Sequence, residues 1–428
     1  MSLLFRLLAV AGLAGALWVV TLPAALTLAP GAAEANEAAY RRFVKSFRAT
    51  ARKSGISGEL YDRAFKGLTP DPVVVKKNAH QPEFVLSAGQ YLSLTVSDTR
   101  IEKGRARLEE LGPVLDKIEA RWGVDKHVLV AIWGMETNFG LFKGDMNVVR
   151  SLSTLGYRGR RARFGRSELL AALKIVQRGE APLEAMVGSW AGAMGHTQLL
   201  PSNFTRYAVD FDGDGKRDIW ETIPDALAST ARFLSSAKWQ AGKTWGYEVA
   251  LPRRFNTKLA GRRNARSIKR WQALGIKRVR GKAFPRPTDT ASLFLPAGRN
   301  GPAFLILRNF RVIMRYNAAT KYALAVGHLS DRLRGGEAFA RPWPGGVRPL
   351  NTAERFELQR RLAAKGYEVG EIDGILGSKT RAAVKAYQKE KKRRADGFPH
   401  PKILELLRAD EGAAIAEDAA TAAPKPAN

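Results

Sequence analysis

The sequence contains no cysteine among its 428 residues. This absence excludes disulfide bonds, thiolate metal sites and a lipid-modified N-terminal cysteine. Acidic residues are also few, because 40 Asp and Glu stand against 70 Lys and Arg, which gives a net charge of +30. An excess of this size predicts a polyanionic environment: nucleic acid, an anionic membrane face or a cell-wall polymer.

Charged residues are nearly absent from the N-terminus. Arg6 is followed by an apolar stretch from Leu7 to Ala29, and then by the small-x-small pattern Ala33-Glu34-Ala35. This order predicts a secretory signal peptide over residues 1–35. The apolar stretch is longer than most signal cores, so an uncleaved anchor interrupted by Pro23 is the alternative. We expect cleavage and an exported, periplasmic protein without stable membrane insertion, and export argues against nucleic acid as the polyanion.

The segment from Val128 to Gly140, VLVAIWGMETNFG, predicts a buried helix that carries one acid, Glu136, to its end. Asp125 is the expected N-cap, and the apolar residues leave almost no polar face. A carboxyl among Trp, Met and Phe loses hydration, which raises its pKa toward the range of an acid/base catalyst. The alternative is that Glu136 caps a neighbouring helix or pairs with an arginine.

Two stretches on either side of this helix offer side chains to a substrate. Upstream, residues 36–123 have a helical pattern with a long amphipathic run from Ser93 to Arg121, and Tyr91 is placed either to line a groove or to fill a core. Downstream, Tyr157 to Arg166 holds five arginines in ten residues. Guanidinium groups suit carboxylates, although a solvated basic face accounts for most of the five.

A segment rich in glycine and alanine, GSWAGAMGHTQLL, runs from Gly188 to Leu200. Its glycines allow a backbone to approach a ligand or another helix closely. Ser189 and Gln198 are the polar side chains there that we expect to hydrogen-bond a sugar. Alone, such a turn is weak evidence for a binding site.

The stretch from Asp210 to Glu221 has the spacing of a calcium-binding EF-hand loop. Oxygen ligands are expected at alternating positions, a glycine at the sixth and a carboxylate at the twelfth. Gly215 is at the sixth position, and Asp225 is a reserve ligand. We predict a structural calcium site formed by Asp210, Asp212, Asp214, the carbonyl of Lys216, Asp218 and Glu221.

Composition changes after a helix predicted from Pro224 to Ser236. Between Arg253 and Lys282 there are twelve basic residues and no acid. We expect these residues to form a basic lobe that contacts an anionic wall, with nucleic acid as the alternative. Two alternating segments, ASLFLPAG and PAFLILRNF, predict a hairpin, and the helix that follows brings Tyr316, Asn317 and Tyr322 to a helix start where they either face the groove or lie in the core.

The chain exceeds one typical domain, and we expect two or three folded units. Residues 335–348 are rich in Pro and Gly and predict a linker. A unit over residues 349–410 follows, with a predicted helix, the turn GYEVGEIDGILG, a second helix, a basic turn and a last short helix. Residues 411–428 are rich in alanine and predict a disordered tail.

Three blocks together resemble one family: ETNFG, GAMGHTQLLPSNFTRYAVDFDGDGKRDIW and NFRVIMRYNAATKYALAV. They are similar to the lytic murein transglycosylases of the B type, from roughly Ala39 to Leu333. The C-terminal unit resembles the three-helix peptidoglycan-binding module of wall enzymes. The resemblance implies a mainly α (α+β) fold with a lysozyme-like catalytic core and a helical shell over residues 36–334. It includes a small β-containing basic lobe at about 245–310.

The same resemblance implies roles for individual residues. Glu136 is implied as the sole catalytic acid and base, and the calcium loop coincides with the family's site. The implied glycan and peptide contacts are Tyr91, Ser189, Gln198, Tyr316, Asn317 and Tyr322 in the groove, with Arg160 and Arg161 beside peptide or lactyl groups. Leu199 departs from the family, which has an aromatic there, as do Arg232 and Phe233 in place of Asn-Tyr.

The implied reaction cleaves the β-1,4 bond between N-acetylmuramic acid and N-acetylglucosamine and forms a 1,6-anhydro product without water. No cofactor is expected for this chemistry beyond the structural calcium ion. Peptidoglycan strands are the expected partner, with other cell-wall enzymes as further partners. The rivals are a lysozyme-like hydrolase, which needs a second acid such as Asp145, and a non-catalytic wall-binding scaffold.

Overall fold

The computed structural model describes residues 30–79, 86–344, 350–393, 395 and 397–410. Most of the predicted signal peptide (residues 1–29) and the predicted tail (411–428) lie outside the described residues, while residues 30–35 belong to the first helix. Helices dominate and the larger of two sheets has five strands, so the prediction of a mainly α fold is confirmed. Within the described residues, no helix is long and apolar enough to span a bilayer.

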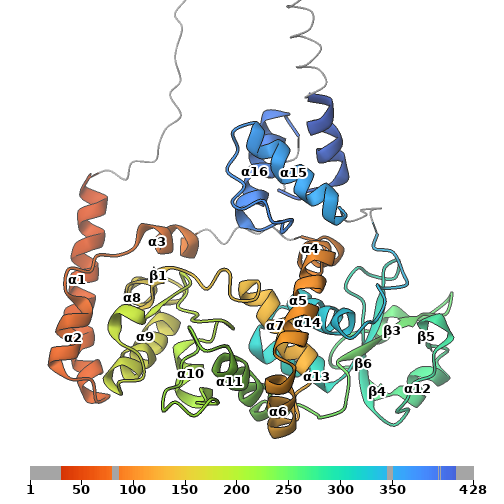
Figure 1. Ribbon diagram of the computed structural model, residues 1–428, viewed down its shortest axis with the longest axis horizontal. Helices are drawn as coiled ribbons and strands as arrows, with labels where there is room; N and C mark the ends of the chain where they lie inside the picture. The colour runs from red at the N-terminus through yellow and green to blue at the C-terminus, as the bar shows by residue number, and fades with distance from the viewer. Residues whose placement is uncertain (1–29, 80–85, 345–349, 394, 396, 411–428) are drawn as a thin grey trace, which may run out of the picture.

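Three groups of elements lie side by side in Figure 1, with a fourth above them. The first group packs around one apolar core and consists of α1 (Pro30–Lys53), α2 (Gly58–Phe65), α3 (Pro72–Ala79), α8 (Val148–Tyr157), α9 (Ala162–Gln177) and α10 (Pro201–Tyr207). The central group consists of α4 (Ala88–Thr95), α5 (Asp98–Glu110), α6 (Gly112–Trp122), α7 (Lys126–Thr137), α11 (Ile223–Ser236), α13 (Arg308–Tyr316) and α14 (Thr320–Leu333). Two short strands, β1 (Met146–Asn147) and β2 (Val187–Gly188), pair antiparallel, and a 3-10 turn (Leu183–Ala185) precedes β2.

The amphipathic run from Ser93 to Arg121 spans parts of three helices. Ser97 separates α4 from α5, because its side chain accepts a hydrogen bond from the Arg100 N–H at 3.2 Å and so caps α5. Pro113 follows at the start of α6, where a missing N–H costs nothing. The caps divide a continuous helical pattern into segments that turn around the central core.

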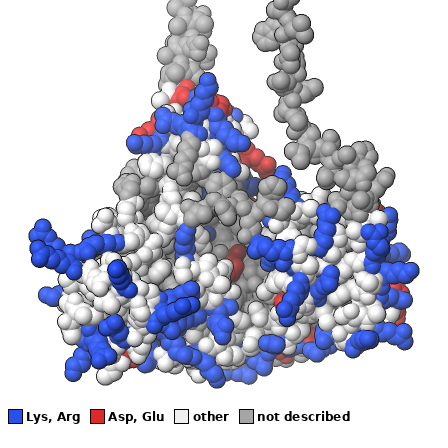
Figure 2. All heavy atoms as spheres, turned by 180° about the vertical axis from the view of Figure 1, so that it is seen from behind, with Lys and Arg blue, Asp and Glu red and all other residues white. Residues whose placement is uncertain are grey.

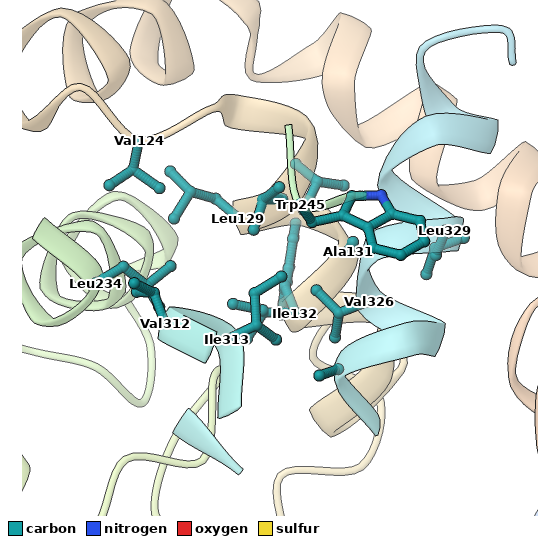
Figure 3. Close-up of a cluster of buried hydrophobic side chains, with 14 of the residues drawn as sticks. Val124, Leu129, Ala131, Ile132, Leu234, Trp245, Val312, Ile313, Val326 and Leu329 are labelled. Atoms are coloured by element: carbon teal, nitrogen blue, oxygen red, sulfur yellow. The ribbon is translucent and has the colours of Figure 1, made fainter. Parts of the chain in front are cut away.

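Helix α7 runs through the middle of the central core. Eight of its twelve residues are buried, and Trp133 has no exposed surface. Figure 3 shows its apolar side chains against neighbouring elements, with Leu129, Ala131 and Ile132 of α7 beside Val326 and Leu329 of α14, Leu234 of α11, Val312 and Ile313 of α13, and Trp245. This packing fixes the direction of α7 and therefore the place of its last turn.

The basic lobe is built on an antiparallel sheet with the order β4-β6-β7-β3-β5. Its elements are β3 (Gly246–Ala250), β4 (Ala265–Ser267), α12 (Ile268–Ala273), β5 (Lys277–Arg278), β6 (Thr290–Phe294) and β7 (Ala303–Ile306), with 3-10 turns at Thr257–Leu259 and Val279–Gly281. The predicted hairpin is formed by β6 and β7, with Leu293 opposite Leu305. Trp271 fills the core of the lobe and donates to the Ala291 carbonyl at 2.9 Å.

The C-terminal unit contains α15 (Thr352–Ala364), α16 (Ser378–Glu390) and a helix over residues 401–410, as the three-helix prediction requires. Its apolar core continues into the central group, since Leu86 and Leu94 belong to the same cluster as Leu358 and Tyr387. The buried Arg355 donates to the Ser93 carbonyl at 2.6 Å. The unit therefore rests directly on α4 (Figure 1).

Residues 337–344, in the predicted linker, are packed along the protein as a strap. Carboxylate oxygens of Glu248 on β3 accept the N–H groups of Ala340 at 2.8 Å and Arg341 at 2.9 Å. The Phe339 ring stacks on His328 with 3.7 Å between centroids, and Trp343 lies against Gly89. The strap ties the lobe to α4 and α14.

Gly327 allows α14 to approach the residue that leads into the lobe. A Cβ at this position would lie 2.5 Å from the Trp245 ring, which is rigid and buried. We expect Gly327→Ala to lower the free energy of unfolding by about 1–3 kcal/mol, because overpacking outweighs the better helix propensity of alanine. Denaturant unfolding measures this difference.

Gly112→Ala is the matched control. Gly112 also lies in a helix, and a Cβ there would meet no atom within 4 Å. The control should be neutral or slightly stabilising. Equal effects of the two substitutions would show that the approach of Trp245 to α14 is not a constraint.

Candidate active site

Glu136 lies in the last turn of α7, where the chain reverses sharply. Asp125 caps the start of the helix by accepting the His127 N–H at 2.9 Å, as predicted. At the other end Asn138, Phe139 and Gly140 all have positive φ. Three successive left-handed residues are rare outside functional turns. They stop the helix one residue after Glu136 and leave its carboxyl at the helix end.

The surroundings of Glu136 disfavour its charged form. Burial raises the pKa of its carboxyl to about 7, and a hydrogen bond from Tyr322 opposes part of this rise. The Tyr322 hydroxyl donates to Oε1 of Glu136 at 2.7 Å. Among the described residues, no neighbouring carboxylate contributes to the shift. A carboxyl with this pKa is partly protonated at neutral pH, so it has a proton to give and a base to offer afterwards.

Three predicted tyrosines surround this carboxyl. Burial and the charge of Glu136 raise the pKa of Tyr322, Tyr316 and Tyr91, the last to about 12. All three therefore stay protonated as hydroxyl donors. The Tyr316 hydroxyl donates to the Thr197 carbonyl at 2.5 Å and so fixes the glycine-rich segment. The Tyr322 hydroxyl fixes the Glu136 carboxyl in the same way.

The glycine-rich segment is fastened beside the end of α7 by hydrogen bonds. Thr137, the residue after Glu136, donates to the His196 carbonyl at 2.6 Å and accepts the Gly140 N–H at 2.9 Å. The His196 ring accepts the Trp133 indole N–H at 3.2 Å. Burial and nearby Lys143 lower the pKa of His196 to about 4, so the ring is neutral and serves as an acceptor. This network aligns the segment with Glu136.

Glycine is required where backbones meet in this region. A Cβ on Gly144 would lie 2.4 Å from the Gly188 carbonyl oxygen, and one on Gly195 would lie 2.3 Å from the Ile219 carbonyl oxygen. Ser189 lies in the same turn, where its hydroxyl accepts the Ala193 N–H at 3.1 Å. Gln198 has a φ of 55° and donates its amide to the carbonyls of Lys143 at 2.9 Å and Gly195 at 3.0 Å. Both predicted side chains thus order the loop.

The remaining predicted contacts differ in their surroundings. Arg160 is exposed. Arg161 is half-buried, with its guanidinium 4.6 Å from the Phe164 ring centre and 5.3 Å from that of Trp190. Asn317 is exposed at the turn between α13 and α14, where its side chain accepts the Ala319 N–H at 3.1 Å.

Sequence reasoning missed Trp190 and His196. Trp190 joins Arg161 to the loop that carries Ser189. The sequence feature that could have indicated Trp190 is its place next to Ser189, the serine expected to bind a sugar. His196 was detectable as one of only five histidines in the chain, placed inside the glycine-rich segment.

Part of the predicted calcium loop has the geometry of a cation site. Carboxylate oxygens of Asp210, Asp212 and Asp214 lie within 4.8 Å of one another. The Asp210 carboxylate accepts the N–H groups of Gly213 at 2.7 Å and Gly215 at 3.0 Å, so it is already oriented toward the loop. Three close carboxylates on an ordered turn fit the oxygen ligands that calcium prefers.

The other predicted ligands make contacts within the loop or beside it. The Lys216 N–H donates to Asp214 at 2.8 Å, a contact that does not involve the Lys216 carbonyl, the predicted ligand. Asp218 accepts the N–H groups of Trp220 at 2.8 Å and Glu221 at 3.0 Å, and the Glu221 carboxylate pairs with the Lys143 ammonium at 3.0 Å. Asp225 is buried and accepts the N–H groups of Phe211 and Asp218. Asp225 therefore holds the loop together from inside.

Asp145, the candidate second acid of a hydrolase, is exposed just before β1. It is absent from the charges that shift the pKa of Glu136. The geometry therefore presents one carboxyl at the end of α7.

The chain resembles known proteins along most of its length. A model of the family described as Transglycosylase SLT domain matches residues 39–331, and one described as Putative peptidoglycan binding domain matches residues 351–407. The membrane-bound lytic murein transglycosylase B of Escherichia coli K12 is 29% identical over 248 residues, which are 56% of this chain and 66% of that protein. The chain thus spans about two thirds of the length of this curated relative.

Solved structures give the same similarity. SltB3 from Pseudomonas aeruginosa in complex with NAG-anhNAM-pentapeptide is 47% identical with a TM-score of 0.70, covering 86% of this chain and 99% of that chain. Slt35 of Escherichia coli in complex with calcium is 25% identical with a TM-score of 0.59, covering 70% of this chain and 94% of that chain. The expected fold class, a lysozyme-like helical core with a small C-terminal module, is confirmed.

Burial of Glu136 predicts a pH-dependent effect on stability. Its folded pKa of about 7 lies above the ordinary value of 4.5, so folding takes up a proton between these values. The charged form therefore destabilises the fold as the pH rises through this window, by on the order of 3 kcal/mol at its end. We expect Glu136→Gln to raise the melting temperature at pH 8 and to have little effect at pH 4.

Thermal unfolding from pH 4 to pH 8 measures this difference. Glu184→Gln, a substitution of an exposed carboxylate, is the control and should show no such trend. A melting temperature that falls equally at all pH values in Glu136→Gln would contradict a costly buried charge.

Proposed function

The chain belongs to the transglycosylase SLT domain family, and we propose that it is a lytic transglycosylase that cleaves the MurNAc-GlcNAc bond of peptidoglycan without water. The observation that carries the proposal is the one carboxyl at the end of α7, that of Glu136, whose pKa of about 7 suits both proton donation and proton acceptance. The relatives bear the same activity in their names. The products are glycan fragments ending in 1,6-anhydroMurNAc.

In the proposed mechanism, the Glu136 carboxyl acts first as an acid and then as a base. Protonated Glu136 gives its proton to the glycosidic oxygen as the bond from that oxygen to C1 of the muramic sugar breaks. The resulting carboxylate takes the proton of the C6 hydroxyl while O6 bonds to C1, which closes the anhydro ring and restores the acid. The Tyr322 hydroxyl supports the carboxylate stage, because a hydrogen bond of 2.7 Å favours the charged form.

A hydrolase is less well supported. Hydrolysis of a glycoside ordinarily uses a second carboxylate to activate water or attack the sugar. Asp145 is exposed, and no described carboxylate acts on the pKa of Glu136. The intramolecular C6 hydroxyl removes the need for such a partner.

The substrate groove is proposed to lie between α4, the end of α7 and the glycine-rich segment. Tyr91, Ser189, Gln198 and Asn317 supply polar atoms to the sugars, while Tyr316 and Tyr322 order the site. Arg160 and Arg161 carry charge for carboxylates of the lactyl or peptide groups, and Trp190 offers a ring beside Arg161. Related SltB3 is known in complex with NAG-anhNAM-pentapeptide, which supports a peptide-bearing substrate here.

We assign residues 36–334 to the catalytic region, with the basic lobe at about 245–310, 335–348 to the linker and 349–410 to peptidoglycan binding. The match of the peptidoglycan-binding family model to residues 351–407 supports the last assignment. An enzyme of this kind meets its substrate in the periplasm after export, where other cell-wall enzymes are its further partners. The positive charge of the chain suits an anionic wall.

A calcium ion is proposed to rigidify the loop from Asp210 to Glu221 without taking part in the chemistry. The clustered carboxylates of Asp210, Asp212 and Asp214 support it, as does calcium in the related Slt35. The loop meets the active site at two places. His196 donates its N–H to the Ile219 carbonyl at 2.9 Å, and Lys143 contacts both Trp220 and Glu221.

The products of sacculus digestion test the reaction. Fragments one water lighter than muramidase products are expected in mass spectra. Glu136→Gln should reduce turnover by about 10³-fold or more, since the sole proton donor is lost. Tyr322→Phe should reduce turnover about 10-fold and move the alkaline limit of activity to higher pH, because the hydrogen bond lowers the pKa of Glu136.

Hydrated fragments would instead identify a hydrolase. Binding of sacculi without soluble products would identify a scaffold, and an unchanged rate in Glu136→Gln would remove this residue from the chemistry. Asp145→Asn is the matched control and should keep wild-type turnover.

The ion pair between Lys143 and Glu221 predicts an effect on calcium affinity. The Lys143 ammonium pairs with the carboxylate of Glu221, the twelfth residue of the loop, and therefore competes with calcium for that carboxylate. Because exposed ion pairs contribute about 0.2–1 kcal/mol, Lys143→Met should tighten calcium binding about 1.4- to 5-fold in calorimetry. Lys103→Met, which removes an exposed cation on α5, is the control. Equal tightening in both would indicate only a general charge effect.

A further inference from the structure

The basic lobe borders a cavity that the proposed catalytic groove does not use. The cavity has a volume of about 550 Å³ and lies between the lobe, the C-terminal end of α14 and the strap. Its aromatic walls are Trp245 and Tyr247 at the start of β3 and Phe339 of the strap. A volume of this size is within the range of small-ligand sites.

Positive charge predominates around the cavity. Five cations line it, namely Arg278, Arg280, Lys282, Arg286 and Arg334, against three acids. His328 adds no charge, because burial lowers its pKa to about 3. Figure 2 shows positive side chains spread widely over one face of the molecule, so charge alone does not define a site.

The partners of the charged groups distinguish this cavity from the rest of the surface. All three acids are already engaged: Glu248 accepts two N–H groups of the strap, Glu337 pairs with Arg280 at 2.7 Å, and Asp331 accepts the Trp245 indole N–H at 2.9 Å. Asp331 also pairs with Arg334 at 3.2 Å. The acids thus neutralise Arg280 and Arg334 and hold the walls together.

Three cations form no ion pair with an acid of the described residues, although the charge of Arg278 also opposes the rise that burial causes in the pKa of Asp331. Arg278 donates to the Ala283 carbonyl at 2.9 Å, and its guanidinium lies 4.9 Å from the centre of the Tyr247 ring. The side chains of Lys282 and Arg286 contact no described acid and are exposed. The cavity therefore offers three positive groups outside any ion pair of the described residues, beside aromatic surface, which suits a chain with more than one carboxylate.

This site is separate from the reacting bond. Tyr322, which binds Glu136, and Asp331, which lines the cavity, lie on the same helix α14. Nine residues at 1.5 Å each place them roughly 14 Å apart along the helix axis, and nine steps of about 100° put them on opposite faces of α14. One sugar pair at Glu136 therefore does not fill both places.

We propose that the cavity is an accessory site for the acidic peptide attached to the glycan, bound through its free carboxylates by Arg278, Lys282 and Arg286. The proposal rests on the proposed function, because it takes the partner to be peptide-bearing peptidoglycan. The site retains the strand near the enzyme and favours peptide-bearing over bare glycan. It gives the basic lobe a defined ligand.

Calorimetry with a short peptide tests the site directly. The probe is N-acetyl-L-Ala-γ-D-Glu-L-Lys, which carries two free carboxylates, and the comparison is the same peptide with both carboxyls amidated. We expect the acidic form to bind and the amidated form to bind at least 10-fold more weakly. The double variant Lys282→Gln with Arg286→Gln should weaken binding of the acidic form at least 5-fold.

The matched control is Arg254→Gln with Arg263→Gln, which removes the same charge from exposed positions of the lobe that do not line the cavity. It should bind the acidic peptide as the wild type does. Equal weakening in both double variants, or equal binding of the two peptides, would overturn the proposal in favour of unspecific attraction.

A kinetic comparison separates this proposal from the catalytic one. On sacculi, the Lys282 and Arg286 variant should show a raised KM and an unchanged kcat, while turnover of glycan stripped of peptides stays as in the wild type. Glu136→Gln should keep peptide binding while losing turnover. Retained turnover in Glu136→Gln refutes the proposed chemistry alone, whereas an unchanged KM in the lobe variant refutes the accessory site alone.

Discussion

The structure depends on keeping one carboxyl out of water at the end of a buried helix. Burial raises the pKa of Glu136 to about 7, and the fold bears the free-energy cost of that environment. Helix α7 supplies the position, since eight of its residues are packed in the core and a run of left-handed residues ends it one residue after the acid. Tyr322 then donates a hydrogen bond to the carboxyl.

The other elements place hydrogen-bonding groups around the end of α7. Thr137, Tyr316 and Gln198 donate to three successive carbonyls of the glycine-rich segment, those of His196, Thr197 and Gly195. Lys143 extends the same network to the loop from Asp210 to Glu221. On the other side, the C-terminal module rests on α4, which carries Tyr91. The C-terminal module, the glycine-rich segment and the loop are therefore each fastened to elements around Glu136.

Local signals in the sequence predicted much of this arrangement. The apolar run with the Asp125 cap predicted α7, and alternation predicted the hairpin of β6 and β7. Spacing predicted the Asp210, Asp212 and Asp214 cluster, since an Asp/Gly loop encodes its own turn. The resemblance to a family then added roles that no local pattern contains.

What escaped prediction depends on contacts between distant residues. The Tyr322 hydroxyl contacts Glu136, which is 186 residues away in the sequence. The place of Tyr322 in the helical pattern fits a core residue equally well, so the pattern did not predict this contact. Glu221 pairs with the Lys143 ammonium and Asp225 accepts two N–H groups, contacts that the spacing of the loop does not predict. The segment rich in Pro and Gly predicted a linker, and the composition did not predict that Phe339 and Trp343, in its described part, pack on His328 and Gly89.

The central claim is that the Glu136 carboxyl titrates near neutrality in the folded protein. Carbon-13 NMR of glutamate side-chain carboxyls measures this, with the signal assigned by its loss in Glu136→Gln. We expect that signal to titrate with a pKa of about 7. A midpoint near the ordinary value of 4.5 would contradict the account, because the site would then hold a charged carboxylate with no proton to give.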